Sequence, residues 1–198
     1  MLLKICQAGE PVLRQRARDL TAEEMTSPAI QQLLALMRDT MRDAPGVGLA
    51  APQVGVGVRV AVIEDRPEYQ AGFPPAELAL RERQAVDFHV LLNPRLTVED
   101  ATLVEFHEGC LSVQGFSALV RRARSVRVDA FDERGQPFSR VATGWYARIL
   151  QHEVDHLDGT LYIDRMEPRS FATMDNHRRH WAQRTVAEVR QALGLTAP

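Results

Sequence analysis

Two histidines and a glutamate in the run His152-Glu153-Val154-Asp155-His156 have the types and spacing of a metal-activated hydrolytic site. On a helix the two histidines are about 40° apart, so both can bind one ion. Glu153 lies about 60° further round, beside the position that such an ion leaves open, where a carboxylate can move protons to and from water. The run predicts a metal-dependent hydrolase. The alternative is a pair of histidines packed in the core.

A catalytic site of this kind needs a third protein ligand, and the sequence after His156 does not supply one in a familiar way. A metzincin-type peptidase continues to a third histidine, but Tyr162 occupies that place here. A thermolysin-type peptidase has a glutamate on a second helix, and neither Glu167 nor Glu188 has a suitable context. The third ligand must therefore be sought earlier in the chain.

Cys110 is the best candidate for the third ligand. Gly109 before it lets the backbone bend, and a thiolate is a strong ligand for a borderline or soft divalent ion. A small buried hydrophobe is the alternative role for such a cysteine. His107 competes as a ligand, but strand alternation places it on the opposite face from Cys110 unless a bulge intervenes at Gly109. Cys6 has no such surroundings and is expected to be structural.

The elements that must position these residues are a central helix and short strands. A helix opening at Gly144 is apolar nearly all round and is therefore predicted to be central. An N-terminal helix begins with Ser27 as N-cap and Pro28 at its first position. The glycine-rich stretch 46–55 can approach a ligand closely, and 58–63 alternates as a strand.

The rest of the chain reads as short β-segments followed by a helix. Six runs have β-type sequence: 89–92, 95–98, 103–107, 119–121, 125–131 and 138–141. Residues 132–135 carry a hairpin signal, 66–87 read as an inserted surface loop, and a final helix is expected from Pro168 to Gly194. We predict an α+β fold with short antiparallel β-sheets packed around the central metal-binding helix, flanked by an N-terminal and a C-terminal helix. A single catalytic domain spans 1–198, with 167–198 as a C-terminal helical extension.

Composition narrows the class of protein. The 198 residues include 45% hydrophobic and 25% charged residues, enough for one well-buried core. A formal net charge of −2 argues against a nucleic-acid binder that uses its whole surface. No sustained apolar run opens the chain, so neither a signal peptide nor a membrane span is expected, and the cytoplasm is the expected location. Two cysteines are too few for a disulfide framework.

Three motifs in order resemble the signature motifs of the peptide deformylase family: 46–53 (GVGLAAPQ), 108–112 (EGCLS) and 151–156 (QHEVDH). The resemblance extends over roughly residues 5–168. It implies an enzyme that removes the formyl group from N-formylmethionine at the start of new polypeptides and releases formate.

The resemblance also implies a role for each motif residue. Cys110, His152 and His156 would hold one divalent ion, physiologically Fe²⁺, although the same donors suit Zn²⁺, Ni²⁺ and Co²⁺. Glu153 would transfer the proton. The Gln53 side-chain amide and the Leu111 backbone N–H would stabilise the developing oxyanion.

Three further residues are assigned to the substrate. Gly48 would hydrogen-bond the peptide through its backbone, with turn geometry as the alternative, and Val47 would help to form an apolar pocket for methionine. Other apolar candidates for that pocket are Leu49, Leu111, Trp145 and Ile149. Glu108 is expected near the substrate or as support for a ligand, with a solvated carboxylate as the alternative. Asp155 is expected to form a structural ion pair with an arginine, with Arg122 as the candidate.

The sequence departs from the family pattern at one position. Many bacterial members have arginine seven residues after the motif cysteine, where this chain has Ser117. Together with the 66–87 insertion, this leaves the peptide preference open and the catalytic set unchanged.

The last helix gathers arginines and two histidines, at positions 165, 169, 177–180, 184 and 190. They form either a solvated face or, as in some relatives, a surface that docks on the ribosome. Two other functions compete with deformylation: a metallopeptidase, and a silent metal-binding relative. Retention of Glu153, Gln53 and Leu111 argues against the silent relative.

Overall fold

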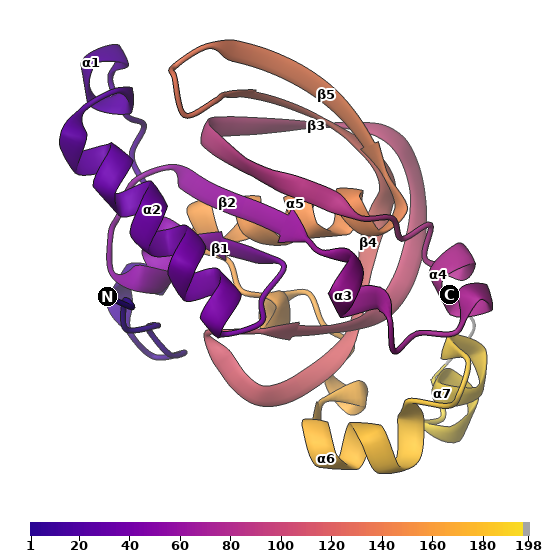
Figure 1. Ribbon diagram of the computed structural model, residues 1–198. Coiled ribbons are helices and arrows are strands. Elements are labelled where there is room, and N and C mark those ends of the chain that lie inside the picture. The colour runs from indigo at the N-terminus through magenta and orange to yellow at the C-terminus, as the bar shows by residue number, and fades with distance from the viewer. Residues whose placement is uncertain (196–198) are drawn as a thin grey trace.

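The computed structural model describes residues 1–195, and Figure 1 shows its elements in order along the chain. The α-helices are α1 (Ala22–Met25), α2 (Pro28–Asp43), α3 (Pro67–Gln70), α4 (Pro75–Leu80), α5 (Gly144–Leu157), α6 (Met174–Asn176) and α7 (Val186–Ala192). The strands are β1 (Gly48–Ala50), β2 (Val60–Asp65), β3 (Val86–Cys110), β4 (Val113–Phe131), β5 (Pro137–Thr143) and β6 (Ala172–Thr173). Short 3₁₀ turns span Pro11–Arg14, Ala51–Val54, Tyr162–Asp164 and Pro168–Ser170, and a π-helical turn spans His177–Trp181.

The strands form one antiparallel sheet in the order β1-β2-β3-β4-β5, and β6 pairs with β4. The short β-segments expected between 89 and 131 are parts of two long strands, β3 and β4. Local signals separated them because β3 is irregular: Asn93 has a left-handed φ of 50°, and the pairing register shifts there and again between Gly109 and Cys110. The α+β class is confirmed, and the expected hairpin at 132–135 joins β4 to β5.

Strand β2 is buried on both faces. Val60 and Val62 belong to the apolar cluster that includes the α2 side chains, whereas Ala61 and Ile63 belong to the cluster that includes α5. Figure 1 shows α2 and α5 on opposite sides of β1 and β2. This part of the fold therefore has three layers, so the alternation expected over 58–63 does not extend through 60–63, which is apolar on both faces.

Helix α5 is central, as its sequence predicts. It contacts every strand from β1 to β5, and ten of its residues, including Leu150 and Leu157, are buried. The predicted start of α2 is also confirmed, since the Ser27 hydroxyl accepts a hydrogen bond from the Ile30 N–H and Pro28 opens the helix. The central helix therefore presents its histidines from a well-packed support.

The 66–87 insertion lies on the surface and contains α3 and α4, as expected. The Arg83 guanidinium anchors its end by donating two hydrogen bonds of 2.8 Å to the buried Asp65 carboxylate.

The prediction of one continuous helix after Pro168 is wrong. Residues 168–170 form a 3₁₀ turn, β6 follows, and two new caps restart the helix. Thr173 caps α6, and Thr185 with Glu188 forms a capping box at the start of α7. The C-terminal segment is thus helical but broken, and β6 fixes its beginning to the main sheet.

Candidate metal centre

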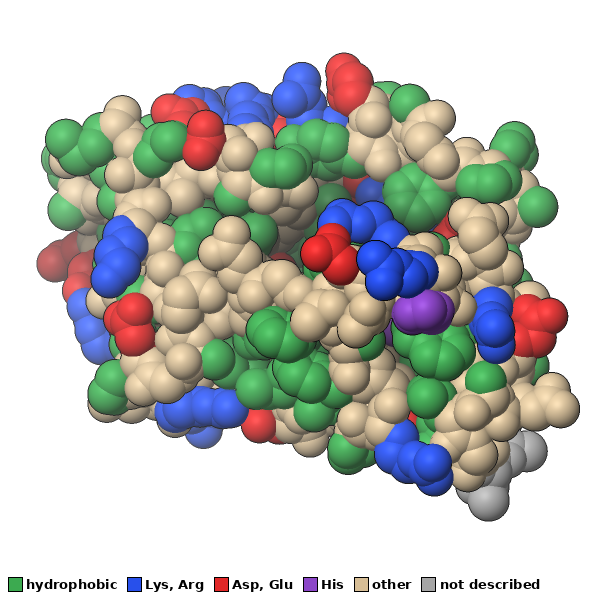
Figure 2. Space-filling model, turned by 90° about the horizontal axis from the view of Figure 1, so that it is seen from below, with side chains coloured by type: hydrophobic (Ala, Val, Ile, Leu, Met, Phe, Trp, Pro, Cys, Tyr) green, Lys and Arg blue, Asp and Glu red, His purple; other side chains and the backbone are tan. Residues whose placement is uncertain are grey.

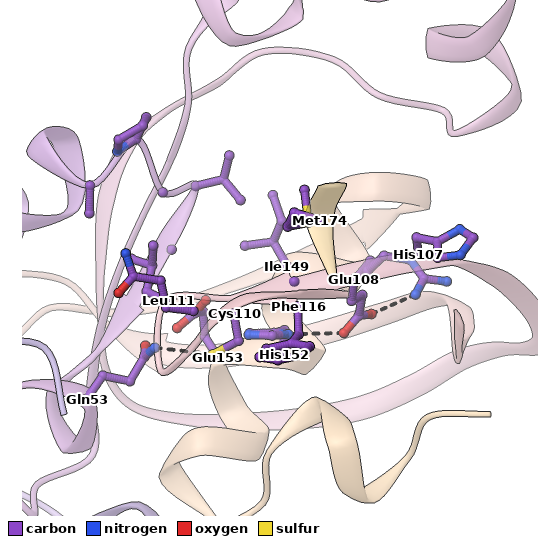
Figure 3. A pocket seen from close by; sticks show the side chains of 18 of the residues that line it. Gln53, His107, Glu108, Cys110, Leu111, Phe116, Ile149, His152, Glu153 and Met174 are labelled. Atoms are coloured by element: carbon purple, nitrogen blue, oxygen red, sulfur yellow. Dashed lines mark hydrogen bonds and ion pairs between the residues drawn. The ribbon is translucent and has the colours of Figure 1, made fainter. Parts of the chain in front are cut away.

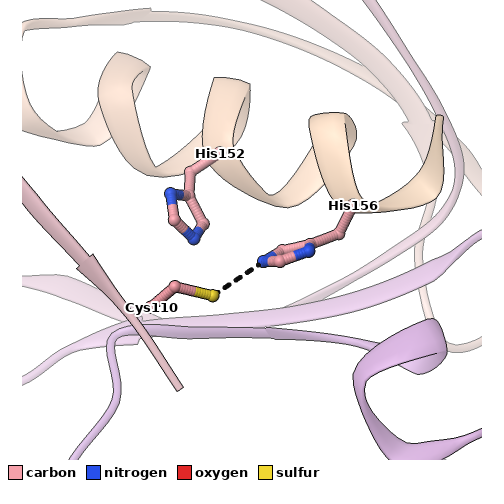
Figure 4. Close-up of side chains that lie close together, drawn as sticks. All are labelled: Cys110, His152 and His156. Atoms are coloured by element: carbon pink, nitrogen blue, oxygen red, sulfur yellow. Dashed lines mark hydrogen bonds between the residues drawn. The ribbon is translucent and has the colours of Figure 1, made fainter. Parts of the chain in front are cut away.

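Cys110, His152 and His156 bring their ligand atoms together. Cys110 ends β3, and the two histidines lie one turn apart on α5 (Figure 4). The three ligand atoms all lie within 4.8 Å of one another, and Cys110 Sγ is 3.2 Å from His156 Nε2. A tetrahedral ion with ordinary bond lengths separates sulfur and nitrogen ligands by about 3.5 Å. The predicted third ligand therefore lies where one ion could join all three.

The electrostatics of the histidines suit a cation. Burial lowers the pKa of His156 well below its usual value, which leaves the ring neutral and able to ligate. Burial also acts against a charged His152, but hydrogen bonds to Cys110 and Glu108 outweigh it and raise the pKa of this ring. The same negative groups would stabilise a divalent ion.

Glu108 holds the His152 ring from behind. The Glu108 carboxylate is 6% exposed and lies 3.0 Å from His152 Nδ1, which leaves Nε2 for the ion. Arg122 donates to both carboxylate oxygens at 3.0 and 2.9 Å, and Arg148 Nη1 donates at 2.6 Å. Burial would raise the pKa of Glu108, but the hydrogen bonds from His152 and Arg122 prevail and lower it. This geometry favours support of a ligand among the roles expected for Glu108.

Asp155 extends this network through Arg122. Its carboxylate pairs with Arg122, as the sequence predicts, and accepts two hydrogen bonds of 2.7 Å from Arg165. Arg122 therefore bridges Glu108 and Asp155, and the ion pair is structural.

The Gln53 amide points at the Cys110 sulfur. Its Oε1 accepts a hydrogen bond of 2.9 Å from the Ala50 N–H, which fixes the amide orientation. Its Nε2 then donates to Ser112 Oγ at 3.2 Å and lies 3.5 Å from Cys110 Sγ. With only 2% of its surface exposed, Gln53 is a positioned donor and not a solvated loop residue.

Glu153 is a buried carboxylate that lies against Gly48. A Cβ atom at position 48 would be 2.2 Å from Glu153 Oε1, so any other residue there would displace the carboxylate. Glu153 is 3% exposed, and its Oε2 has no hydrogen-bond partner. Burial raises its pKa to about 7, against a smaller opposing effect of His152. A carboxyl group in this state can both accept and donate a proton near neutral pH.

A cavity of about 470 Å³ is lined by Gln53, Cys110, His152 and Glu153, among others (Figure 3). Four of the five apolar candidates for the methionine pocket line it: Val47, Leu111, Trp145 and Ile149. Leu49 does not, because it is fully buried in the cluster with α2. Sequence reasoning missed Phe116 and Met174, which come from β4 and α6 and carry no local signal. It also missed Arg148, although a charged residue on an apolar helix was a signal.

His107 lines the same cavity but lies outside the ligand group. In the described part of the chain, only Cys110, His152 and His156 form such a group. The His107 ring packs against His177 with centroids 4.3 Å apart, and burial lowers its pKa to about 3. The bulge at Gly109 therefore admits both side chains to one cavity without making His107 a ligand.

Comparisons with known proteins identify the family to which the chain belongs. The family model described as polypeptide deformylase matches residues 2–172. Chloroplastic peptide deformylase 1A of Solanum lycopersicum is 46% identical over 87% of this chain and 62% of its own length. Peptide deformylase 1 of Streptomyces coelicolor is 47% identical over 99% of this chain and 88% of its own length. The chain thus spans less than two thirds of the tomato relative.

A solved structure is similar in fold. The crystal structure of a class I type b peptide deformylase from Acinetobacter baumannii with Met-Ala-Ser bound has a TM-score of 0.75. The two sequences are 34% identical, and the match covers 84% of this chain and 99% of the Acinetobacter chain.

Proposed function

This chain belongs to the polypeptide deformylase family, and we propose that it removes the N-formyl group from formylmethionine at the start of new polypeptides and releases formate. One observation carries the proposal: a buried carboxylate with an unpartnered oxygen, Glu153, lines a cavity together with Cys110, His152 and Gln53, and His156 completes the group of three convergent ligand atoms. These are the parts that hydrolysis of a formamide requires.

Each residue has a distinct part in the proposed mechanism. A divalent ion bound by Cys110, His152 and His156 would lower the pKa of a water molecule and polarise the formyl group. Glu153 takes the proton from the attacking water and passes it to the departing amine nitrogen, a transfer favoured by its pKa of about 7.

The Gln53 Nε2–H and the Leu111 backbone N–H donate hydrogen bonds to the developing oxyanion. The backbone of Gly48 and the side chain of Val47 orient the formylmethionine in the cavity. Glu108 keeps the His152 ring in place.

The assay compares a formylated with an unformylated Met-Ala-Ser peptide. The proposal expects formate from the first and no change in the second. Cleavage of an internal peptide bond in either would indicate a metallopeptidase instead.

We propose Fe²⁺ as the physiological ion, as the family resemblance implies. One thiolate and two imidazoles also accept Zn²⁺, Ni²⁺ and Co²⁺, so purification in air can exchange the metal. Anaerobic purification with metal analysis, followed by a formate assay for each reconstituted ion, tests this. A preparation that contains only zinc and is fully active would argue against iron.

We propose the cytoplasm as the location and the ribosome as a docking partner of the C-terminal segment. In residues 1–195 no helix is long and apolar enough to cross a membrane. Some arginines of the C-terminal segment have internal roles, since Arg165 pairs with Asp155 and Arg190 pairs with Glu105. Arg178 and Arg179 are exposed. Replacing both by glutamate should weaken cosedimentation of the protein with ribosomes. Equal cosedimentation at all salt concentrations would refute docking.

A further inference from the structure

A second hollow of about 420 Å³ is the neighbour of the metal-site cavity, since Phe116 lines both. The second hollow is lined by aromatic and apolar side chains, Phe116, Phe171, Trp181 and Leu193, and by the basic residues Arg169 and His180. We call it the downstream groove. Figure 2 shows the molecule from below, the side on which α6 lies, with hydrophobic side chains beside a histidine and basic residues.

The pairing of β6 with β4 builds the floor of this groove. Phe116 pairs with Thr173 and Ser117 with Ala172, which brings the preceding residue, Phe171, beside Phe116. The two rings stack with centroids 4.9 Å apart and planes 6° from parallel. They are 37% and 40% exposed, so the stacked pair offers an aromatic surface to solvent. Such surfaces bind large side chains at low entropic cost.

The charge of the groove is one-sided. Among residues 1–195, no carboxylate lines it and none is paired with the exposed Arg169. By contrast, neighbouring Arg165 and Arg178 each pair with an aspartate. Arg169 is therefore available to an external carboxylate.

We propose that the downstream groove binds the substrate polypeptide beyond its first residues. A large apolar side chain would lie on Phe116 and Phe171, and an acidic side chain would pair with Arg169. The proposal rests on the proposed deformylase function, because the Phe116 ring shared with the metal-site cavity selects the substrate chain as the occupant. Binding in the downstream groove makes the enzyme selective for the length of the substrate polypeptide and for the charge of its downstream residues.

The test compares three formylated peptides by formate release: formyl-Met-Ala-Ser, a seven-residue extension with Phe and Asp downstream, and the same extension with Lys in place of Asp. In the wild type, we expect the Asp peptide to exceed the tripeptide in kcat/KM by about tenfold, mainly through KM. It should exceed the Lys peptide by about threefold.

Two variants locate the effect. Phe171→Ala should remove most of the gain with length, and Arg169→Glu should reverse the preference between Asp and Lys. Arg134→Glu is the matched control, because Arg134 is exposed on the hairpin between β4 and β5 and lines neither hollow, and it should behave as the wild type. Turnover of the tripeptide reports in each case that the variant is folded.

The outcomes separate this inference from the proposed function. If the wild type hydrolyses the tripeptide but gains nothing with length, the downstream groove is refuted and deformylation stands. A gain that persists in both Phe171→Ala and Arg169→Glu refutes it too, as does a loss in these variants that is equal for all three peptides. If no formylated peptide releases formate, the proposed function fails and the inference falls with it.

Discussion

Replacing Gly48 by alanine should disable the proton transfer without removing the metal. An alanine Cβ would lie 2.2 Å from Glu153 Oε1, whereas real Cβ atoms essentially never approach closer than 3.0 Å. The carboxylate must therefore move by about 1 Å, and a displacement of that size in a catalytic group typically costs about a hundredfold in rate. We expect kcat for formyl-Met-Ala-Ser to fall by about that factor, with metal content unchanged.

The assay is steady-state formate release, with metal analysis of the same samples. Gly57→Ala is the matched control, because a Cβ there would meet no atom within 4 Å, and it should keep full activity. Adding Gly48→Ala to a Glu153→Ala variant should cost far less than adding it to the wild type, since both changes act through one carboxylate. A Gly48→Ala enzyme within threefold of wild-type kcat would refute the reasoning.

Further predictions concern the ligands and their surroundings. Cys110→Ala should abolish metal retention and His107→Ala should not, by metal analysis after dialysis; a Cys110→Ala protein that keeps its metal would overturn the ligand set. Glu108→Ala leaves the buried Arg148 without its carboxylate partner and Arg122 with Asp155 alone, so urea unfolding should show a loss of about 3 kcal/mol and metal titration a drop in affinity of at least about tenfold; unchanged values would exclude Glu108 as support. The folded pKa of His107 is about 3 and its unfolded pKa about 6.5, so its contribution to stability is complete above pH 6.5 and is lost as pH falls toward 3. His107→Phe should flatten the fall in urea-measured stability over that range by about 2 kcal/mol, allowing for partial exposure, and an identical pH profile would contradict this.

Local sequence signals predicted the elements that depend on neighbouring residues. Ser27 and Pro28 fix the start of α2, and the spacing of His152 and His156 fixes their common side of α5. Such features need no knowledge of distant contacts. Strand β1 shows the limit of such local signals. All three of its residues are buried, so alternation along the sequence does not separate its two faces. Leu49 faces the core, whereas Val47, just before the strand, faces the cavity.

Other features depend on contacts between distant parts of the chain. Arg148 meets Glu108 from 40 positions away, and Met174 reaches the cavity only because β6 pairs with β4. Periodicity within one segment cannot encode these contacts. The break in the C-terminal helix was readable, however, because Thr185 and Glu188 have the spacing of a capping box.

The most direct test of the central claim is the product balance of the anaerobically purified, metal-loaded chain acting on formyl-Met-Ala-Ser. The account predicts one formate and one free methionine amino group for each peptide consumed, with both lost on chelation and in Glu153→Ala. Release of alanine or serine fragments without formate would contradict it.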